Sequence, residues 1–252
     1  MKLARYLLLL SATLLSTNGF ADDFTATEAK IKAAMAADIR TPEEVERDSN
    51  RLPLETLQFF GLRDDMTIVE LMPGGGWYSK ILAPVMAENG EYYMALGAGR
   101  ANEALAGKPG FENIKVTAEE AKISRPEGAP SYVIENPDLG VKNVDMVLTF
   151  RNYHNFAAEG RAAMNKASFD ALKSGGIYAV VDHTRRHMEK DNSENGRRAD
   201  PVLAIKEIQA AGFVLVDFST LHHIPDDELR YEVGRKTVTG NTDRWSLKFV
   251  KP

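Results

Sequence analysis

The sequence contains no cysteine. This excludes a disulfide framework, and it also excludes the lipid-modified cysteine that anchors bacterial lipoproteins. The absence does not identify a redox compartment, but a chain without thiols is chemically safe in an oxidising one. The chain also lacks sequence repeats and long low-complexity tracts. An ordinary globular domain is therefore the expectation.

The sequence has no excess of positive charge. It carries 31 Lys and Arg against 36 Asp and Glu, which gives a formal net charge of −5. This balance argues against nucleic acid or an anionic membrane as the main partner, because both select basic surfaces. We therefore expect a small-molecule substrate as the partner, and the sequence leaves the oligomeric state open.

Long apolar runs are missing, with one exception near the start of the chain. Tyr6–Leu15 is apolar and follows two basic residues, Lys2 and Arg5, while Gly19–Ala21 has the small-x-small pattern of a cleavage site. Together these features predict a secretory signal peptide over residues 1–21, cut after Ala21. The run is too short for a permanent membrane anchor. We expect a secreted protein, located in the periplasm if the source is Gram-negative.

Residues 22–252 have the length of a single α/β domain. The part before residue 62 is expected to be a helical extension. Apolar spacing predicts a helix over Thr27–Ile39. Thr41 is a candidate cap for a second helix, with Pro42 at its first position.

A charged cluster in this extension consists of Arg47, Asp48 and Arg51. It precedes a short apolar helix that should end at Gly61. The cluster could cover the mouth of a ligand site. A solvated helix face is the commoner role for such a cluster, and we favour it.

A glycine-rich turn is the centre of the chain. A β-branched run over Thr67–Val69 ends at Glu70, then Gly74, Gly75 and Gly76 follow, and a segment with helical spacing starts at Trp77. Strand, glycine turn and helix is the arrangement in which α/β proteins hold nucleotide-like ligands, because glycine lets the backbone approach the ligand closely. The alternatives are a nicotinamide site, which the acidic residue disfavours, and a tight turn without a ligand.

Further strands follow at the spacing of an α/β protein. They are predicted over residues 90–96, 111–116, 144–150, 177–181, 213–217 and 245–250. A turn is expected over 173–176, a helix over 201–211 capped by Asp200, and loops over 124–140 and 192–198, the latter as a flexible lid. The expected fold class is α/β, with a doubly wound, Rossmann-like, seven-stranded mixed sheet.

Polar residues follow the strand over 144–150 without a break: Arg151, Asn152, Tyr153, His154 and Asn155. Ligands of open parallel sheets bind beyond the carboxyl ends of the strands, so this segment is well placed for a site. Tyr153 or His154 could act as general base, because imidazole exchanges protons near neutral pH. Asn152 and Asn155 could orient a substrate. The alternative is a structural connector in which His154 caps a helix.

Asp182 and His183 end the next strand along and should reach the same edge of the sheet. Together with His154 and His187 they could supply metal ligands. No pair among them is supported by a helical spacing, so we predict no metal site.

Several motifs occur together in one order and carry a resemblance. The stretch from Glu70 to Gly76 is similar to Asp/Glu-x-Gly-x-Gly-x-Gly, motif I of class I S-adenosylmethionine (SAM) methyltransferases, with Met72 at the first glycine. The other motifs are Arg51–Gly61, Arg151–His154, Val181–His183, Arg198–Pro201 and Gly240–Arg244. Together they resemble the bacterial family of secreted "predicted methyltransferases", over nearly the whole chain after the signal peptide.

The resemblance implies a class I methyltransferase fold and SAM as cofactor. It implies that Glu70, Trp77 and the glycines of the turn bind the cofactor, and that Tyr153 or His154, with Asn152, acts in catalysis. Arg151, Asn155, Asp182 and His183 would bind an unknown small acceptor. The strand over 90–96 lacks the acid that often holds the ribose of SAM. The alternative is therefore a non-catalytic secreted ligand-binding protein on a methyltransferase scaffold.

Overall fold

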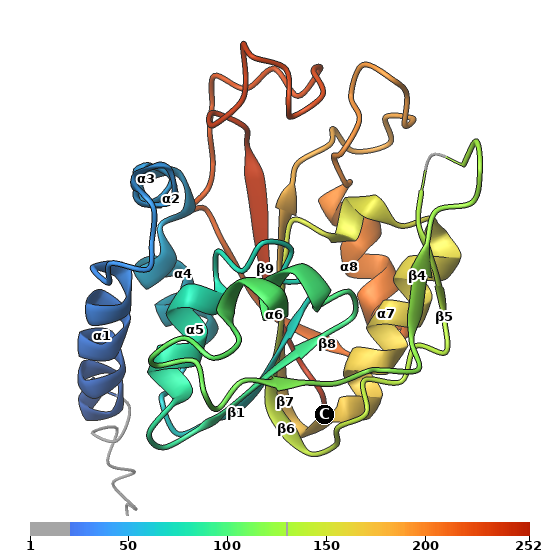
Figure 1. Cartoon of the computed structure of the whole chain (residues 1–252). Helices are drawn as coiled ribbons and strands as arrows, with labels where there is room; N and C mark the ends of the chain where they lie inside the picture. Colours follow the sequence, from blue (N-terminus) through green and yellow to red (C-terminus); the bar gives the residue numbers. More distant parts are fainter. Residues whose placement is uncertain (1–20, 130) are drawn as a thin grey trace, which may run out of the picture.

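A computed structural model describes residues 21–129 and 131–252 and contains a sheet of seven strands (Figure 1). These strands are β1 (Thr67–Leu71), β2 (Glu91–Ala95), β3 (Lys115–Val116), β6 (Val144–Phe150), β7 (Leu172–His183), β8 (Val214–Ser219) and β9 (Arg244–Val250). Their order across the sheet is β3-β2-β1-β6-β7-β9-β8. β9 is antiparallel to both of its neighbours, β7 and β8, and the other pairs are parallel.

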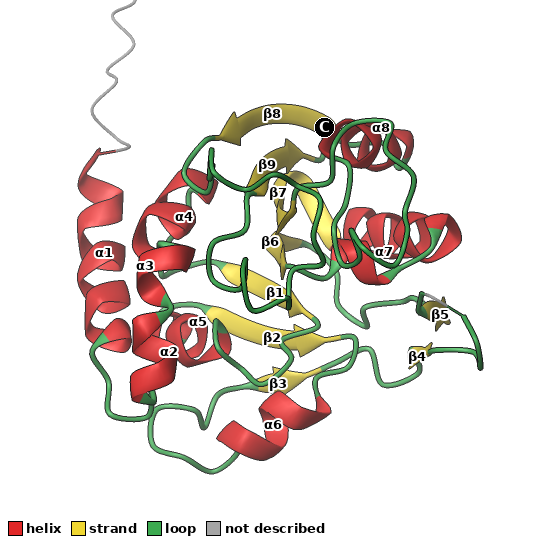
Figure 2. Cartoon of the chain, turned by 90° about the horizontal axis from the view of Figure 1, so that it is seen from above, coloured by secondary structure: helices red, strands yellow, loops and turns green. Residues whose placement is uncertain are grey.

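Helices cover both faces of this sheet (Figure 2). One face packs against α1 (Ala21–Met35), α4 (Pro53–Phe60), α5 (Ser79–Met86) and α6 (Gly99–Leu105), and the other against α7 (Ala158–Ala171) and α8 (Pro201–Ala210). The short helices α2 (Pro42–Glu46) and α3 (Asp48–Arg51) lie above α4 in the view of Figure 1. The predicted seven-stranded, doubly wound mixed sheet is confirmed.

Side-chain alternation along β1 divides the core into two layers. Ile68 packs with the helices of the first face, whereas Val69 and Leu71 pack with those of the second. All three residues have no exposed surface. Central parallel strands are apolar on both sides because helices cover both faces of the sheet.

The predicted helix boundaries at three positions are confirmed. Thr41 caps α2 through a complete capping box with Glu44. Gly61 ends α4 in the left-handed conformation, with φ of 78°. Asp200 caps α8 by accepting hydrogen bonds from the backbone N–H groups of the first turn. These local signals work because each satisfies backbone groups that a helix end leaves unpaired.

Three predicted segments differ in the structure. The strand over 111–116 is reduced to β3, and the loop over 124–140 takes part in a small antiparallel pair, β4 (Lys122–Ser124) with β5 (Val133–Glu135). The turn over 173–176 lies inside β7. Leu172 pairs with Val144, and the pairing resumes at Ile177 with Met146, so the extra residues form a bulge rather than a separate turn.

The loop predicted over 192–198 is a loop in the structure, but two of its residues are buried. Asn195 is 1% exposed and Arg198 is 2% exposed. The Arg198 guanidinium forms a two-pronged ion pair with the buried Asp227, at 2.8 and 3.0 Å, and also donates to the carbonyl of Tyr231. Polar composition suggested a solvated loop, but buried ionic contacts hold this segment in place.

The predicted signal peptide, residues 1–21, lies outside the described residues except for Ala21, which begins α1. Within the described ranges, no helix has the length and apolar character needed to cross a membrane.

The Arg198–Asp227 pair gives a direct test of this packing. Replacement of one member of a buried pair leaves the other charge without a partner, so Arg198→Met should lower the free energy of unfolding by about 3–5 kcal/mol. The neighbouring Arg197 pairs with Glu232 at an exposed site, and Arg197→Met should change it by less than about 1 kcal/mol. Urea denaturation measures both. Equal effects at the two positions would contradict the conclusion that the Arg198–Asp227 pair holds this segment in place.

Candidate functional site

The carboxyl ends of β1, β6 and β7 meet at one edge of the sheet, where ligands of such folds bind. Because β9 is antiparallel, its first residue lies at this same edge, and Arg244 pairs in register with His183. The antiparallel strand therefore adds a basic residue to the site.

The glycine turn keeps a left-handed backbone at the three motif positions. The φ angles are 50° at Met72, 62° at Gly74 and 83° at Gly76. A Cβ at Gly76 would lie 3.2 Å from Leu105, whereas Gly75 has open space around its Cβ position. Gly76 thus allows α6 to pack closely, and Gly75 is the position open to a ligand.

Met72 adopts this conformation although it has a side chain, which costs roughly 1–2 kcal/mol for an ordinary residue. Met72→Gly should therefore be more stable than Met72→Ala by about 1 kcal/mol. At the exposed helical residue Lys166, glycine should instead be less stable than alanine by about 1 kcal/mol. Thermal or urea unfolding of the four variants measures the two differences. An alanine preference at both positions would contradict the left-handed turn.

Glu70 lies beneath the turn and is 3% exposed. Its carboxylate accepts hydrogen bonds from the hydroxyls of Ser79, at 2.8 Å, and Tyr92. Burial raises the pKa of Glu70 to about 7, although these hydrogen bonds act in the opposite direction. Glu70 thus joins the end of β1 to the start of α5 and to β2.

This pKa makes stability depend on pH in a defined direction. The folded state binds a proton more tightly than the unfolded state, so the stability that Glu70 contributes is lost as pH rises from 4.5, the group's ordinary pKa, to about 7. Glu70→Gln keeps an oxygen that can accept a hydrogen bond from Ser79 or Tyr92, and it removes the carboxyl group that titrates. The variant should lose less stability than the parent between pH 5 and pH 7.5 in urea denaturation. Parallel pH profiles would show that Glu70 does not titrate in this range.

Trp77 connects the turn to the N-terminal helices. Its indole N–H donates to the carbonyl of Glu44 at 3.0 Å. The Arg51 guanidinium lies 4.1 Å from the centre of its ring, a cation–π contact. The structure therefore places Trp77 between the glycine turn and α2–α3.

Asn152 joins the polar segment to the same turn. Its side-chain amide donates to the carbonyls of Leu71 and Met72 and to the hydroxyl of Thr149, each at 3.2 Å. The preceding residue, Arg151, has φ of 62°. The end of β6 is thereby fixed against the end of β1.

His154 and Asp182 form a carboxylate–imidazole pair. The Nδ1 atom of His154 lies 2.6 Å from Oδ1 of Asp182, and the backbone N–H of His154 donates to Oδ2 at 2.8 Å. Asp182 has no exposed surface. A carboxylate can only accept, so Nδ1 carries the proton and Nε2 is the nitrogen left to receive one.

Tyr153 is directed elsewhere. Its hydroxyl donates to Glu207 at 2.7 Å and accepts from Asn165 at 3.1 Å. Burial and the Glu207 carboxylate raise the pKa of Tyr153 far above its ordinary value. The two candidate bases are adjacent in sequence, yet the structure brings only His154 to the large cavity described below.

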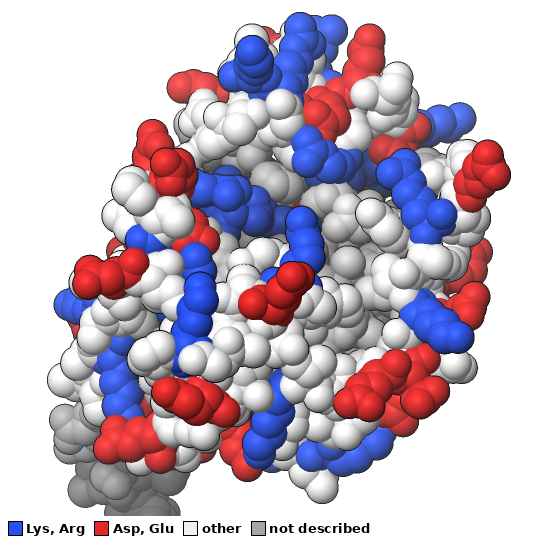
Figure 3. Space-filling model, viewed as in Figure 1, with Lys and Arg blue, Asp and Glu red and all other residues white. Residues whose placement is uncertain are grey.

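A cavity of about 700 Å³ lies at the sheet edge. Its walls come from α2–α3, from the ends of β6 and β7, and from the segment before β9. Four predicted residues line it: Arg151, His154, Asn155 and His183. It is also lined by basic residues that were not predicted as site residues, namely Arg47, Arg51, Arg197 and Arg244. Figure 3 shows Lys and Arg side chains gathered around a hollow in the upper part of this face.

The prediction of a solvated face for Arg47, Asp48 and Arg51 is wrong at Arg51. That residue is 4% exposed, because its guanidinium packs on Trp77 and its helix packs on the sheet edge. Asp48 instead forms an ion pair with Arg40. Arg51 was identifiable as charged, but its burial depends on an aromatic ring 26 positions away in the chain.

His183 borders the cavity as a neutral residue. Burial and the nearby Arg244 hold its pKa well below the ordinary value. Its Nδ1 atom lies 3.0 Å from the hydroxyl of Thr242.

His187 is separate from His154 and bonds to Asp200 at 2.9 Å. Among the residues that the structure describes, no group of three or more His, Asp or Glu side chains is arranged to hold a metal ion.

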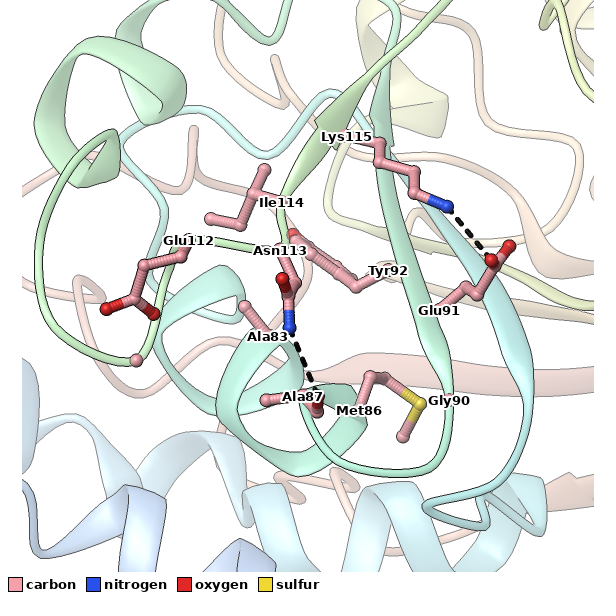
Figure 4. Close-up of a pocket in the computed structure, with 11 residues that line it drawn as sticks. Ala83, Met86, Ala87, Gly90, Glu91, Tyr92, Glu112, Asn113, Ile114 and Lys115 are labelled. Atoms are coloured by element: carbon pink, nitrogen blue, oxygen red, sulfur yellow. Dashed lines mark hydrogen bonds and ion pairs between the residues drawn. The ribbon is translucent and has the colours of Figure 1, made fainter.

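A second cavity, of about 340 Å³, lies at the opposite edge, where β2 and β3 begin (Figure 4). It contains an exposed ion pair between Glu91 and Lys115 and a hydrogen bond from Asn113 to the carbonyl of Ala87. Exposed pairs of this kind contribute little energy. No histidine and none of the predicted site residues is among the residues that line this second cavity, so the candidate site is the basic cavity.

The fold is similar to that of solved SAM-dependent methyltransferases. One from Aquifex aeolicus has a TM-score of 0.59 at 16% identity, covering 89% of this chain and 98% of that one. The glycopeptide N-methyltransferase MtfA has a TM-score of 0.53 at 12% identity, covering 84% of this chain and 100% of that one. The [4+2]-cyclase SpnF has a TM-score of 0.56 at 13% identity, covering 91% of this chain and 93% of that one.

No family model and no curated protein matches the sequence. At these identities, the similar structures show that the chain has the class I methyltransferase fold. They do not fix its reaction, since one fold hosts many functions. The resemblance to the bacterial secreted family stays a prediction.

Proposed function

We propose that the protein transfers a methyl group from SAM to a small acceptor. The observation that carries this proposal is the junction of two features at one sheet edge: the glycine turn and the His154–Asp182 pair. Asn152 links them, because it bonds to the turn at Met72 and lies two residues before His154. The similarity in fold to SAM-dependent methyltransferases supports the same reaction.

The backbone conformation of the glycine turn is compatible with a bound cofactor. Met72, Gly74 and Gly76 keep left-handed φ angles, and Gly75 leaves open space. The backbones of Gly74 and Gly75 would hold SAM, which supplies an electrophilic methyl group. Glu70 and Trp77 would position the turn, the first through Ser79 and the second through Glu44.

The acceptor is proposed to lie in the basic cavity beside His154. Nε2 of His154 takes the proton that the acceptor loses as it is methylated. Asp182, bonded to Nδ1, orients the ring and stabilises the imidazolium that forms. Arg151, Asn155 and the neutral His183 bind the acceptor. Tyr153 is assigned a supporting role, because its hydroxyl is committed to Glu207.

We also propose secretion, on the basis of the N-terminal pattern over residues 1–21. A periplasmic methyltransferase needs SAM outside the cytoplasm. The compartment therefore bears directly on whether the reaction runs in the cell.

A calorimetric titration of the purified protein with SAM and with its demethylated product tests the function. Binding at micromolar strength, about −8 kcal/mol, is expected. Gly75→Trp should abolish it, because the indole fills the space above the turn, whereas Gly75→Ala should keep most of the affinity.

Circular dichroism spectra of both variants serve as the control for folding, and a titration with NADH tests the nicotinamide alternative. Absence of binding to SAM and its product would contradict methyl transfer. That result would favour the non-catalytic ligand-binding protein.

A further inference from the structure

Four arginines of the cavity have no carboxylate partner in the described part of the chain: Arg47, Arg51, Arg151 and Arg244. A fifth, Arg197, forms an ion pair with Glu232. This concentration of charge is unexpected in an acidic protein of net charge −5.

Two of the four are buried. Arg51 is 4% exposed, and its guanidinium contacts the ring of Trp77. Arg244 is 8% exposed and donates one hydrogen bond, to the carbonyl of Asn50 at 2.6 Å. The Nε atoms of Arg151 and Arg244 are buried without a hydrogen-bond partner. In the described part of the chain, these guanidinium groups therefore hold donors that no protein acceptor pairs.

The arginines also act on one another. Burial, together with the charges of Arg151 and Arg47, lowers the pKa of Arg51 to about 8. Burial and the charge of Arg244 lower the pKa of Arg151 to about 10. Buried cations without counter-charges destabilise a fold. A bound anion would relieve both the desolvation and the mutual repulsion.

Nearby acids offset the charge of the cluster only in part: Asp182 and Asp243 act to raise the pKa of Arg244, but the ion pairs that they form are with histidines. Asp182 is committed to His154, and Asp243 binds His223 and the backbone N–H of Ile224, at 2.9 and 2.8 Å. Glu43 and Glu46 line the cavity from α2, and both are exposed. The neutral His183 adds no charge. The walls therefore carry an excess of positive charge around a volume of about 700 Å³.

We propose that this cavity binds a small organic molecule with two or more negatively charged oxyanion groups, and that this molecule is the methyl acceptor. The second half of this statement rests on the proposed function. Carboxylate and phosphate groups both match the fork of a guanidinium, which donates two parallel hydrogen bonds. The volume suits a small metabolite rather than a polymer. A basic cavity in an acidic protein also concentrates anions at the site itself.

Calorimetric titration with citrate and with inorganic pyrophosphate tests the binding and separates carboxylate from phosphate preference. At least one probe should bind, and its affinity should fall as sodium chloride is raised. Arg47→Met and Arg51→Met should each weaken binding by tenfold or more. Arg125→Met is the matched control and should leave the affinity unchanged, because Arg125 follows β4 and does not line the cavity.

A measurement of thermal unfolding shows whether a loss of binding in a variant is caused by a loss of folding. Because Arg51→Met removes a buried cation without a counter-charge, its midpoint of thermal unfolding without anion should equal or exceed that of the parent. A fixed concentration of the probe should raise the midpoint of the parent more than that of the variant, because the variant binds the probe more weakly. Absence of binding by both probes, or equal binding by the parent and both cavity variants, would overturn the proposal.

The SAM titration separates this proposal from the proposed function. If anions bind in the cavity and SAM does not bind, the anion site stands and methyl transfer fails. If SAM binds and neither anion does, methyl transfer stands and the anionic acceptor is rejected.

Discussion

The cavity depends on a set of hydrogen bonds to the backbone carbonyl of Arg51. This carbonyl accepts hydrogen bonds from Nε2 of His222 at 3.0 Å, from the Thr56 hydroxyl at 3.1 Å and from the Tyr78 hydroxyl at 3.4 Å. These donors belong to the segment before β9, to α4 and to the end of the glycine turn. Burial keeps His222 neutral by lowering its pKa, so the ring donates through one nitrogen and bonds to Ser246 through the other.

This junction explains why the two halves of the site adjoin. The N-terminal helices are held against the sheet edge, and α3 then forms one wall of the cavity while Trp77 supports Arg51. The antiparallel β9 supplies Arg244 to the cavity, where its guanidinium donates a hydrogen bond to Asn50 of α3. Burial of the arginines is thus a consequence of how the extension docks, and the energetic cost of that burial is what an anion would offset.

The sequence predicted features that depend on local signals. Strand periodicity, the Thr41 and Asp200 caps and the glycine turn identified the architecture, because each is satisfied within a few residues. The sequence could not show which of Tyr153 and His154 faces the cavity, since adjacent side chains in a tight turn point in different directions. It also misjudged Arg51, because burial under Trp77 and contact with the β9 segment arise only when distant parts of the chain meet.

The most direct test of the account is a crystal structure of the protein grown with S-adenosylhomocysteine and the tighter of the two anion probes. The account predicts the nucleoside compound at the Gly74–Gly76 turn and the anion within hydrogen-bonding distance of Arg51 and Arg151, with His154 between them. S-adenosylhomocysteine inside the arginine cavity, or a cavity that holds only water, would contradict it.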